Sequence, residues 1–191
     1  MRTHSKDTSA RVLRLTYSAL YLAIALVLPF LTGQIPQIGS TLCPMHIPAL
    51  LCGFVCGWPW GLAVGFIAPL LRMVMFGMPP FYVAIAMAFE LLTYGLVSGI
   101  MYRKVFKKQT VGTLYGSLLI AMVAGRIVWG IVKVILSGIA ADAGAFTFAA
   151  FISGALLNAI PGIVVQLILV PAVVVALQKA KLIEAPSAEK A

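Results

Sequence analysis

The chain has 191 residues, of which 62% are hydrophobic and only 10% are charged, and its mean hydropathy is +1.05. A soluble domain has about 45–50% apolar and about 25% charged residues, so this composition excludes one. The net charge of +9 does not indicate nucleic-acid binding, because most Lys and Arg residues lie in three short clusters between or outside long apolar runs. These runs predict a helical membrane protein, and the alternating pattern of a membrane β-barrel is absent.

The chain begins with a basic tail and a first apolar run. Residues 1–14 carry four Lys or Arg residues, and no cleavage pattern follows the apolar run, so we expect a retained cytoplasmic tail. A transmembrane helix is predicted over 15–31, where Ala19 and Ala23 form a small-xxx-small pair that permits close helix contact in lipid. Residues 32–44 contain Gly and Pro but no Lys or Arg, and they predict a long loop.

Two apolar arms follow, and the rest of the chain is organised around them. The first, from about His46 to Val55, is shorter than the ~20 apolar residues that a transmembrane helix needs. The second, from Trp60 to Phe76, contains Pro69 and Arg72. Glycines recur every four residues across both arms, at Gly53, Gly57, Gly61 and Gly65. This stripe is typical of tight helix packing, whereas short, Pro-interrupted helices that carry a charge also occur at binding sites in membranes.

Three more transmembrane helices are predicted, over 81–102, 111–137 and 151–177. Six helices place both ends of the chain on one side of the membrane. All three basic clusters then lie on that side, and the loops on the other side contain no Lys or Arg, which predicts cytoplasmic termini in the cell membrane. We therefore expect an all-α transmembrane domain of six helices over 15–178, with cytoplasmic tails over 1–14 and 179–191.

Four charged residues lie inside the predicted spans, where contact with lipid at mid-bilayer would cost a few kcal/mol each. They are Arg72, Glu90, Arg126 and Lys133. At about 1.5 Å per residue, Glu90 lies ~13 Å and Arg126 ~16 Å from the outer surface, so we expect an ion pair between them near the midplane. Lys133 lies two turns nearer the outer surface, at a depth comparable with that of Arg72.

Two interpretations of these charges remain open. In one, Glu90 neutralises Arg126 structurally, while Arg72 and Lys133 extend to the outer headgroups. In the other, three bases against one acid leave a positive surplus in a cavity that opens outward, which favours a carboxylate ligand. Trp129 shares a helix face with Arg126 and Lys133 and would line this cavity. Further candidates for the site are Tyr82, Tyr94, Phe146 and Asn158.

Histidine and cysteine give weaker signals. His46, at the junction of the loop and the first arm, is typical of a hydrogen-bonding residue at a helix start, with a ligand contact as the alternative. Cys43, Cys52 and Cys56 lie mostly within one helix and do not form a disulfide framework. The other histidine, His4, lies in the opposite tail, so we expect no metal site. Nothing indicates a catalytic pair, and we expect no enzyme activity.

With these features the chain resembles the substrate-binding S components of the energy-coupling factor (ECF) vitamin transporters. The resemblance covers nearly the whole chain and includes its length, six spans and cytoplasmic ends. It also includes the Ala19–Ala23 pair, the Pro-Met-His-Ile-Pro segment at 44–48 that leads into the Gly-rich arms, and Gly-Met-Pro-Pro at 77–80.

The resemblance implies a high-affinity binding subunit for a vitamin or vitamin precursor in a prokaryote, typically a Gram-positive one. The ligand would bind on the outer side, between the first outer loop and the three helices predicted over 81–102, 111–137 and 151–177, and the whole subunit would tilt to present it inward. The implied partners are a transmembrane scaffold subunit and two ATPase subunits that use ATP; this chain itself carries no cofactor. In the family the small-residue face of the first helix docks on the scaffold, so Ala19 and Ala23 take that role.

The positive surplus favours an anionic substrate such as pantothenate, folate or nicotinate. A stand-alone secondary transporter of a small organic anion is the main alternative. It would need an ion or proton relay, and Glu90 is the one acid within the predicted spans. No inverted repeat is visible that would strengthen this alternative, and no filter-like repeat indicates a channel.

Overall fold

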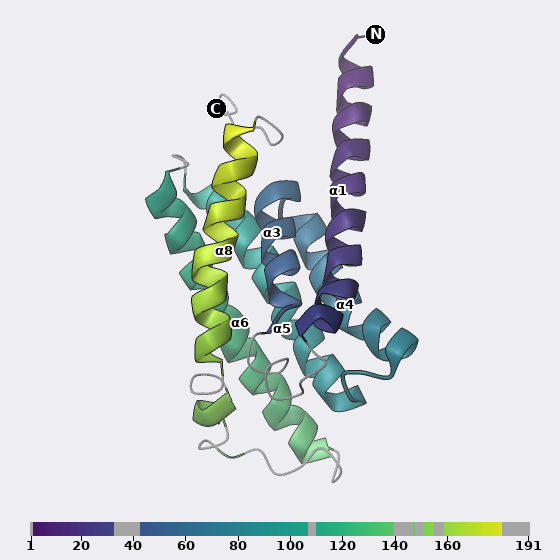
Figure 1. The fold of residues 1–191 in the computed structure, drawn as a ribbon, viewed down its shortest axis with the longest axis vertical. Helices are drawn as coiled ribbons and strands as arrows, with labels where there is room; N and C mark the ends of the chain where they lie inside the picture. Colours follow the sequence, from purple (N-terminus) through teal and green to yellow (C-terminus); the bar gives the residue numbers. More distant parts are fainter. Residues whose placement is uncertain are drawn as a thin grey trace.

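The computed structural model describes residues 2–32, 43–106, 110–139, 147, 151–154 and 159–180. These ranges contain α1 (Arg2–Thr32), α3 (His46–Cys56), α4 (Trp58–Phe76), α5 (Phe81–Ile100), the π-helix η1 (Met101–Val105), α6 (Val111–Ile139) and α8 (Ile160–Lys179) (Figure 1). Five of the helical spans are long and apolar enough to cross a membrane, and α3 is a shorter apolar helix of 11 residues. The predicted all-α membrane protein of six helices is confirmed.

Two helices differ from their predicted bounds. α1 begins at Arg2 rather than near residue 15, because residues 2–14 contain no Gly or Pro that would stop a helix. α8 begins at Ile160 rather than at 151, and a short helical turn at 151–154 precedes it. Pro161 lies in the first turn of α8, where the missing N–H leaves no hydrogen bond unmade. A proline that was predicted inside a helix therefore marks its start.

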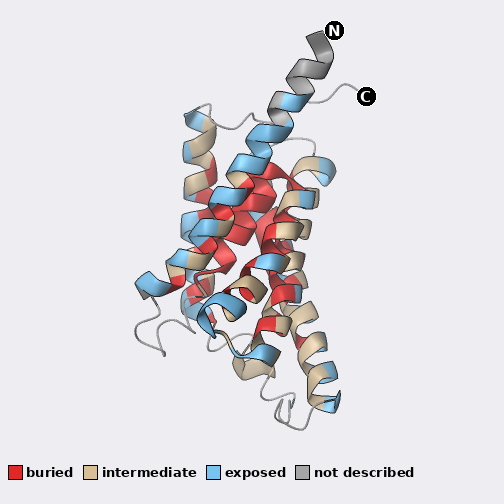
Figure 2. Cartoon of the chain, turned by 90° about the vertical axis from the view of Figure 1, so that its right-hand side faces the viewer, coloured by how far each residue is buried: buried red, intermediate tan, exposed pale blue. Residues whose placement is uncertain are grey.

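α3 is the centre of the bundle. All of its 11 residues are buried, and it packs on α1, α4, α5 and α8. Buried positions gather in the middle of the bundle, whereas α1 exposes much of its length (Figure 2). Because α3 is buried on every side, its residues after His46 are apolar all round.

Glycines bring the backbones of α3, α4 and α5 together. A Cβ on Gly61 would lie 2.6 Å from the Cα of Gly53, and one on Gly95 would overlap the backbone of Gly61. Gly65 approaches the backbone of α5 in the same way. The predicted stripe is nevertheless interrupted, because the chain turns at Gly57 with a φ of 97°, and this glycine lies beside Arg103 instead. We call Gly53, Gly61, Gly65 and Gly95 the glycine seam.

α1 begins and α8 ends at the same end of the bundle, which we call the terminal end; the opposite end is the far end (Figure 1). At the terminal end Arg103 donates from Nε to the carbonyl oxygen of Phe54 at 3.2 Å and from Nη2 to that of Val55, so it caps the last turn of α3. α3 is joined to α4 here and is only ~16 Å long, against ~28 Å for α4. His46, the first residue of α3, therefore lies about halfway along the bundle.

Candidate functional site

A buried carboxylate lies at this halfway level. Glu90 of α5 is 1% exposed, and its Oε1 is 3.0 Å from Arg126 Nη1 of α6 and 3.3 Å from His46 Nε2 of α3. The hydroxyl of Tyr94 donates to the same oxygen at 3.2 Å. The predicted ion pair between Glu90 and Arg126 is present, and His46 and Tyr94 join it. We call Glu90, Arg126, His46 and Tyr94 the Glu90 cluster.

Local structure positions each member of the Glu90 cluster. Tyr94 lies one turn after Glu90 on α5, so that its hydroxyl reaches back to the carboxylate. Its ring fills the space beside Gly125 of α6, where any Cβ would overlap the ring. The ring of His46 packs edge-to-face on that of Tyr94, with 5.3 Å between centroids. Helix α3 thus starts where its first side chain meets α5, but the hydrogen bond that the helix-start interpretation expects from His46 is not present among the described residues.

The cluster compensates two charges that could not be buried alone. An ionised side chain that loses its partner in a low-dielectric interior costs several kcal/mol. The side chain of Arg126 is 14% exposed and that of Glu90 only 2%, so the guanidinium lies at the more accessible edge of the pair. Its Nη2 is 3.9 Å from the Sγ of Cys43, which has a φ of 48° that is uncommon outside glycine.

Several polar atoms around this cluster have no hydrogen-bond partner. Within the described part of the chain, the buried side-chain nitrogen and oxygen atoms of this kind belong to three residues: His46 (both ring nitrogens), Arg126 (Nε) and Gln166 (Nε2 and Oε1). The 3.3 Å contact of His46 with Glu90 is close enough for an ion pair but is not aligned as a hydrogen bond. Buried polar atoms are nearly always paired, so the unpartnered atoms of His46 and Arg126 mark the Glu90 cluster as a place for a polar ligand or for water.

A family model described as "ECF transporter, substrate-specific component" matches residues 13–174. The chain belongs to this family. Comparison with curated proteins and with solved structures gives no match. The chain is thus a membrane-embedded subunit that gives an ECF transporter its substrate specificity, and the family implies a scaffold and an ATPase module as its partners. As a transporter subunit, an S component is not an enzyme.

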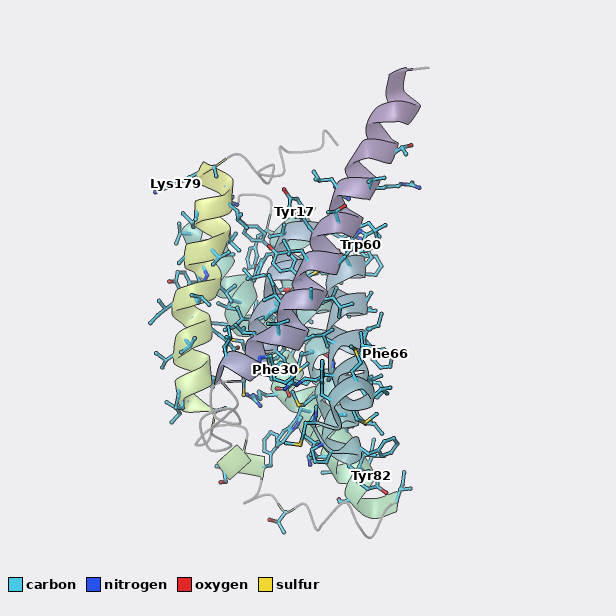
Figure 3. The ribbon with its side chains drawn as sticks, turned by 45° about the vertical axis from the view of Figure 1, so that its right-hand side comes forward. Tyr17, Phe30, Trp60, Phe66, Tyr82 and Lys179 are labelled. Atoms are coloured by element: carbon cyan, nitrogen blue, oxygen red, sulfur yellow. The ribbon has the colours of Figure 1, made fainter. Side chains whose placement is uncertain are left out.

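The structure separates Arg72 from the other candidate ligands of this S component. Arg72 is 9% exposed; its Nη1 donates to the carbonyl oxygen of Leu26 at 2.6 Å, and its guanidinium lies over the rings of Phe30 and Phe76. Phe30 is near the far end of α1 (Figure 3). α4 packs on α1, α3 and α5, whereas α6 packs on α5 and α8. Arg72 therefore ties α4 to α1, and its role as a ligand stays a prediction.

Lys133 and Trp129 lie on α6, toward the far end from Arg126. Lys133 is half-buried and has no ion pair among the described residues. The indole of Trp129 stacks on Phe151, with 6.2 Å between ring centroids, and also lies against Gly154. Tyr82 packs on Phe81 at the far end (Figure 3). The other two candidates, Phe146 and Asn158, lie outside the described residues.

The predicted coupling residues lie on the outside of the bundle. Ala19 and Ala23 of α1 are both exposed, whereas Ser18, Tyr21 and Ala25 face the core. A shallow apolar hollow of about 310 Å³ begins at Ala23 and continues along α1 toward the far end. The pair is therefore available to another protein or to lipid, and its role in coupling stays a prediction.

Proposed function

We propose that this S component binds a small organic anion, a carboxylate-bearing vitamin or vitamin precursor, at the Glu90 cluster and the adjoining face of α6. The observation that carries the proposal is Arg126, a partly buried guanidinium that is paired with Glu90 and whose Nε–H has no hydrogen-bond partner among the described residues. A guanidinium holds a carboxylate well because it offers several donors in one plane.

The charges around the site favour an anion. Glu90 balances Arg126, while Lys133 has no acidic partner in the described ranges. Arg126 and Lys133 are seven residues apart on one face of α6, which corresponds to ~10 Å along the helix. Trp129 lies between them on that face, so a ligand that reaches both bases would pass along its indole.

The direction of access follows from α3 and from the loops. The glycine seam and the buried α3 are tightly packed in the terminal half of the bundle, so we expect access to the Glu90 cluster from the far end. The distribution of Lys and Arg supports an orientation with the far end outside the cell and both termini in the cytoplasm. The ligand would therefore enter from outside, and a transmembrane scaffold subunit with two ATPase subunits would drive its release inward at the expense of ATP.

The proposal is tested by identifying the compound that the purified chain retains, by mass spectrometry, and by measuring affinities for pantothenate, folate and nicotinate. Lys133→Met is expected to weaken binding of the anion by ~1.5–3 kcal/mol, about 10- to 150-fold. Lys104→Met is a matched control, because Lys104 lies over Trp58 at the terminal end, and it should leave affinity unchanged. Arg72→Gln should lower stability while binding persists.

Three results would contradict the proposal. A retained compound without negative charge, or equal affinity of the wild type and Lys133→Met for the anion, would contradict the proposed anion site. A large loss of affinity in Arg72→Gln with unchanged stability would show that Arg72 contacts the ligand and that the site lies closer to α1. Uptake by the chain alone, without ATP and its partners, would favour the secondary transporter instead.

A further inference from the structure

We infer that Gln166 of α8 binds an uncharged amide-type group of the ligand, so that the substrate is a carboxylate that also carries a carboxamide, lactam or ureido group. This inference rests on the proposed function and narrows it. Gln166 is not among the site residues predicted from the sequence, where Asn158 is the amide chosen from the predicted helix over 151–177.

The register of α5 and α8 places Gln166 level with the Glu90 cluster. At the terminal end, Gln178 Nε2 donates to the hydroxyl of Tyr102 at 2.8 Å. Glu90 lies twelve residues before Tyr102, and Gln166 lies twelve residues before Gln178. Both stretches run in the same direction and are helical, so each residue lies ~18 Å from this contact. The two side chains therefore occupy the same level of the bundle.

Burial shows which way the amide faces. The buried face of α8 is formed by residues four apart, namely Gly162, Gln166, Val170 and Val174. This is the face that α8 turns toward α3 and α6, which carry His46 and Arg126. Gln166 is 0% exposed, and neither Nε2 nor Oε1 has a hydrogen-bond partner in the described part of the chain. The amide thus points into the bundle with both of its polar atoms unpaired.

The chemistry of this amide selects the ligand group. Nε2 donates and Oε1 accepts, and the two atoms lie side by side. A carboxylate offers only acceptors and would leave Oε1 unpaired against a like partial charge, and an ammonium group would leave Nε2 unpaired. A carboxamide, lactam or ureido edge, on which N–H and C=O lie side by side, offers one acceptor and one donor with matching spacing and satisfies both atoms. A site built in this way rejects an analogue that lacks the group, because its own buried atoms are then left without partners.

Four probes separate the two features of the substrate. Biotin and folate carry a carboxylate together with a ureido or lactam edge, nicotinate carries a carboxylate without such an edge, and nicotinamide carries a carboxamide edge without a carboxylate. Affinities are measured with the full chain purified from membranes. One of the first two should bind the wild type more tightly than either nicotinate or nicotinamide. Gln166→Leu, which keeps the volume and removes both polar atoms, should weaken that probe by about 10- to 100-fold.

The control is Gln178→Leu, the same substitution on the same helix at the terminal end, and it should leave the order of the four affinities unchanged. Because the amide of Gln166 has no hydrogen-bond partner among the described residues, Gln166→Leu should not lower the melting temperature of the ligand-free protein. Should Gln166→Leu still fail to fold, Gln166→Glu tests the same point, since it keeps the shape and replaces the donor with an acceptor.

The results distinguish this inference from the proposed function. Tightest binding of nicotinate, or a retained anion without any amide-type group, would overturn the role of Gln166 and leave the anion site standing. A lower melting temperature of ligand-free Gln166→Leu with unchanged probe affinities would show that ordered water satisfies the amide, and would also overturn it. If no probe binds and no organic compound is retained, both proposals fail together.

Discussion

Replacing Glu90 by Gln tests whether the Glu90 cluster is held together by charge. The substitution keeps the shape of the side chain and leaves an oxygen for the Tyr94 hydroxyl, which donates to Oε1 at 3.2 Å. It removes the negative charge that lies 3.0 Å from Arg126 Nη1. Because Glu90 is 1% exposed, little water can take its place, and the guanidinium loses its counter-charge in the interior. Loss of one partner of a buried ion pair costs about 3–5 kcal/mol.

The assay is reversible unfolding of the ligand-free protein in detergent, with the free energy compared among four proteins. Glu90→Gln should lose about 3–5 kcal/mol, whereas Glu90→Gln combined with Arg126→Met should recover most of this loss because no unpaired charge remains. Thr93→Val is a control on the same helix, since the Thr93 hydroxyl donates to the carbonyl oxygen of Phe89 one turn away. This control should cost about 1 kcal/mol or less.

Two results would refute this reasoning. A stability of Glu90→Gln equal to that of the wild type would mean that water, rather than Glu90, compensates Arg126. A double variant as unstable as the single one would mean that Arg126 has no unfavourable charge to remove. Binding in the double variant decides between the two interpretations of the pair. If the double variant is stable but has lost affinity, Arg126 contacts the ligand; if it still binds, the pair is structural.

Three further predictions concern topology, coupling and packing. A reporter fused within the loop before α8 should be exposed outside the cell and one in the loop after η1 inside it; the reverse result would overturn the orientation. Ala19→Trp and Ala23→Trp should abolish uptake while substrate binding by the purified protein stays nearly intact. The control Ala176→Trp, at an exposed position of α8, should leave uptake and binding unchanged. If Ala19→Trp and Ala23→Trp reduce binding as much as uptake, α1 contributes to the binding site. Gly95→Ala should lower the free energy of unfolding by about 3 kcal/mol or more, because the added Cβ would overlap the backbone of α4. Gly138 has nothing within contact distance, so Gly138→Ala should be neutral or raise the free energy of unfolding by up to ~1 kcal/mol.

The parts of the fold that depend on local patterns could be predicted from the sequence. Apolar runs located α3, α4, α5 and α6 within a few residues, because membrane-spanning helices are defined by length and hydropathy. Counting residues along α5 and α6 predicted similar depths in the membrane for Glu90 and Arg126, and the structure confirms the contact between their side chains. The start of α8 was predicted wrongly, although Pro161 was an available signal for a first turn.

The rest depends on how the helices are rotated and paired, which a single sequence does not encode locally. Counting depth along the helices predicted Arg72 and Lys133 at the same level of the membrane. In the structure Arg72 instead turns toward α1, where it lies over the ring of Phe30, a residue that is distant from Arg72 in the sequence. The contacts with α1 explain the burial of Arg72 without a ligand or a lipid headgroup. Gln166 could not be chosen from other polar residues of α8 until the contact of Gln178 with Tyr102 fixed the register of this helix against α5.

The short α3 and the glycine seam also bear on how a bound molecule is released. A route toward the terminal end would require α3, α4 and α5 to separate, yet their backbones meet so closely that one added methyl group would overlap them. Packing of this density does not deform gradually, so such an opening would break most of the core contacts at once. Reorientation of the whole bundle keeps the seam intact and turns the same site toward the other side of the membrane. The exposed Ala19–Ala23 face of α1 would give a scaffold subunit a surface on which to hold the chain in that second orientation.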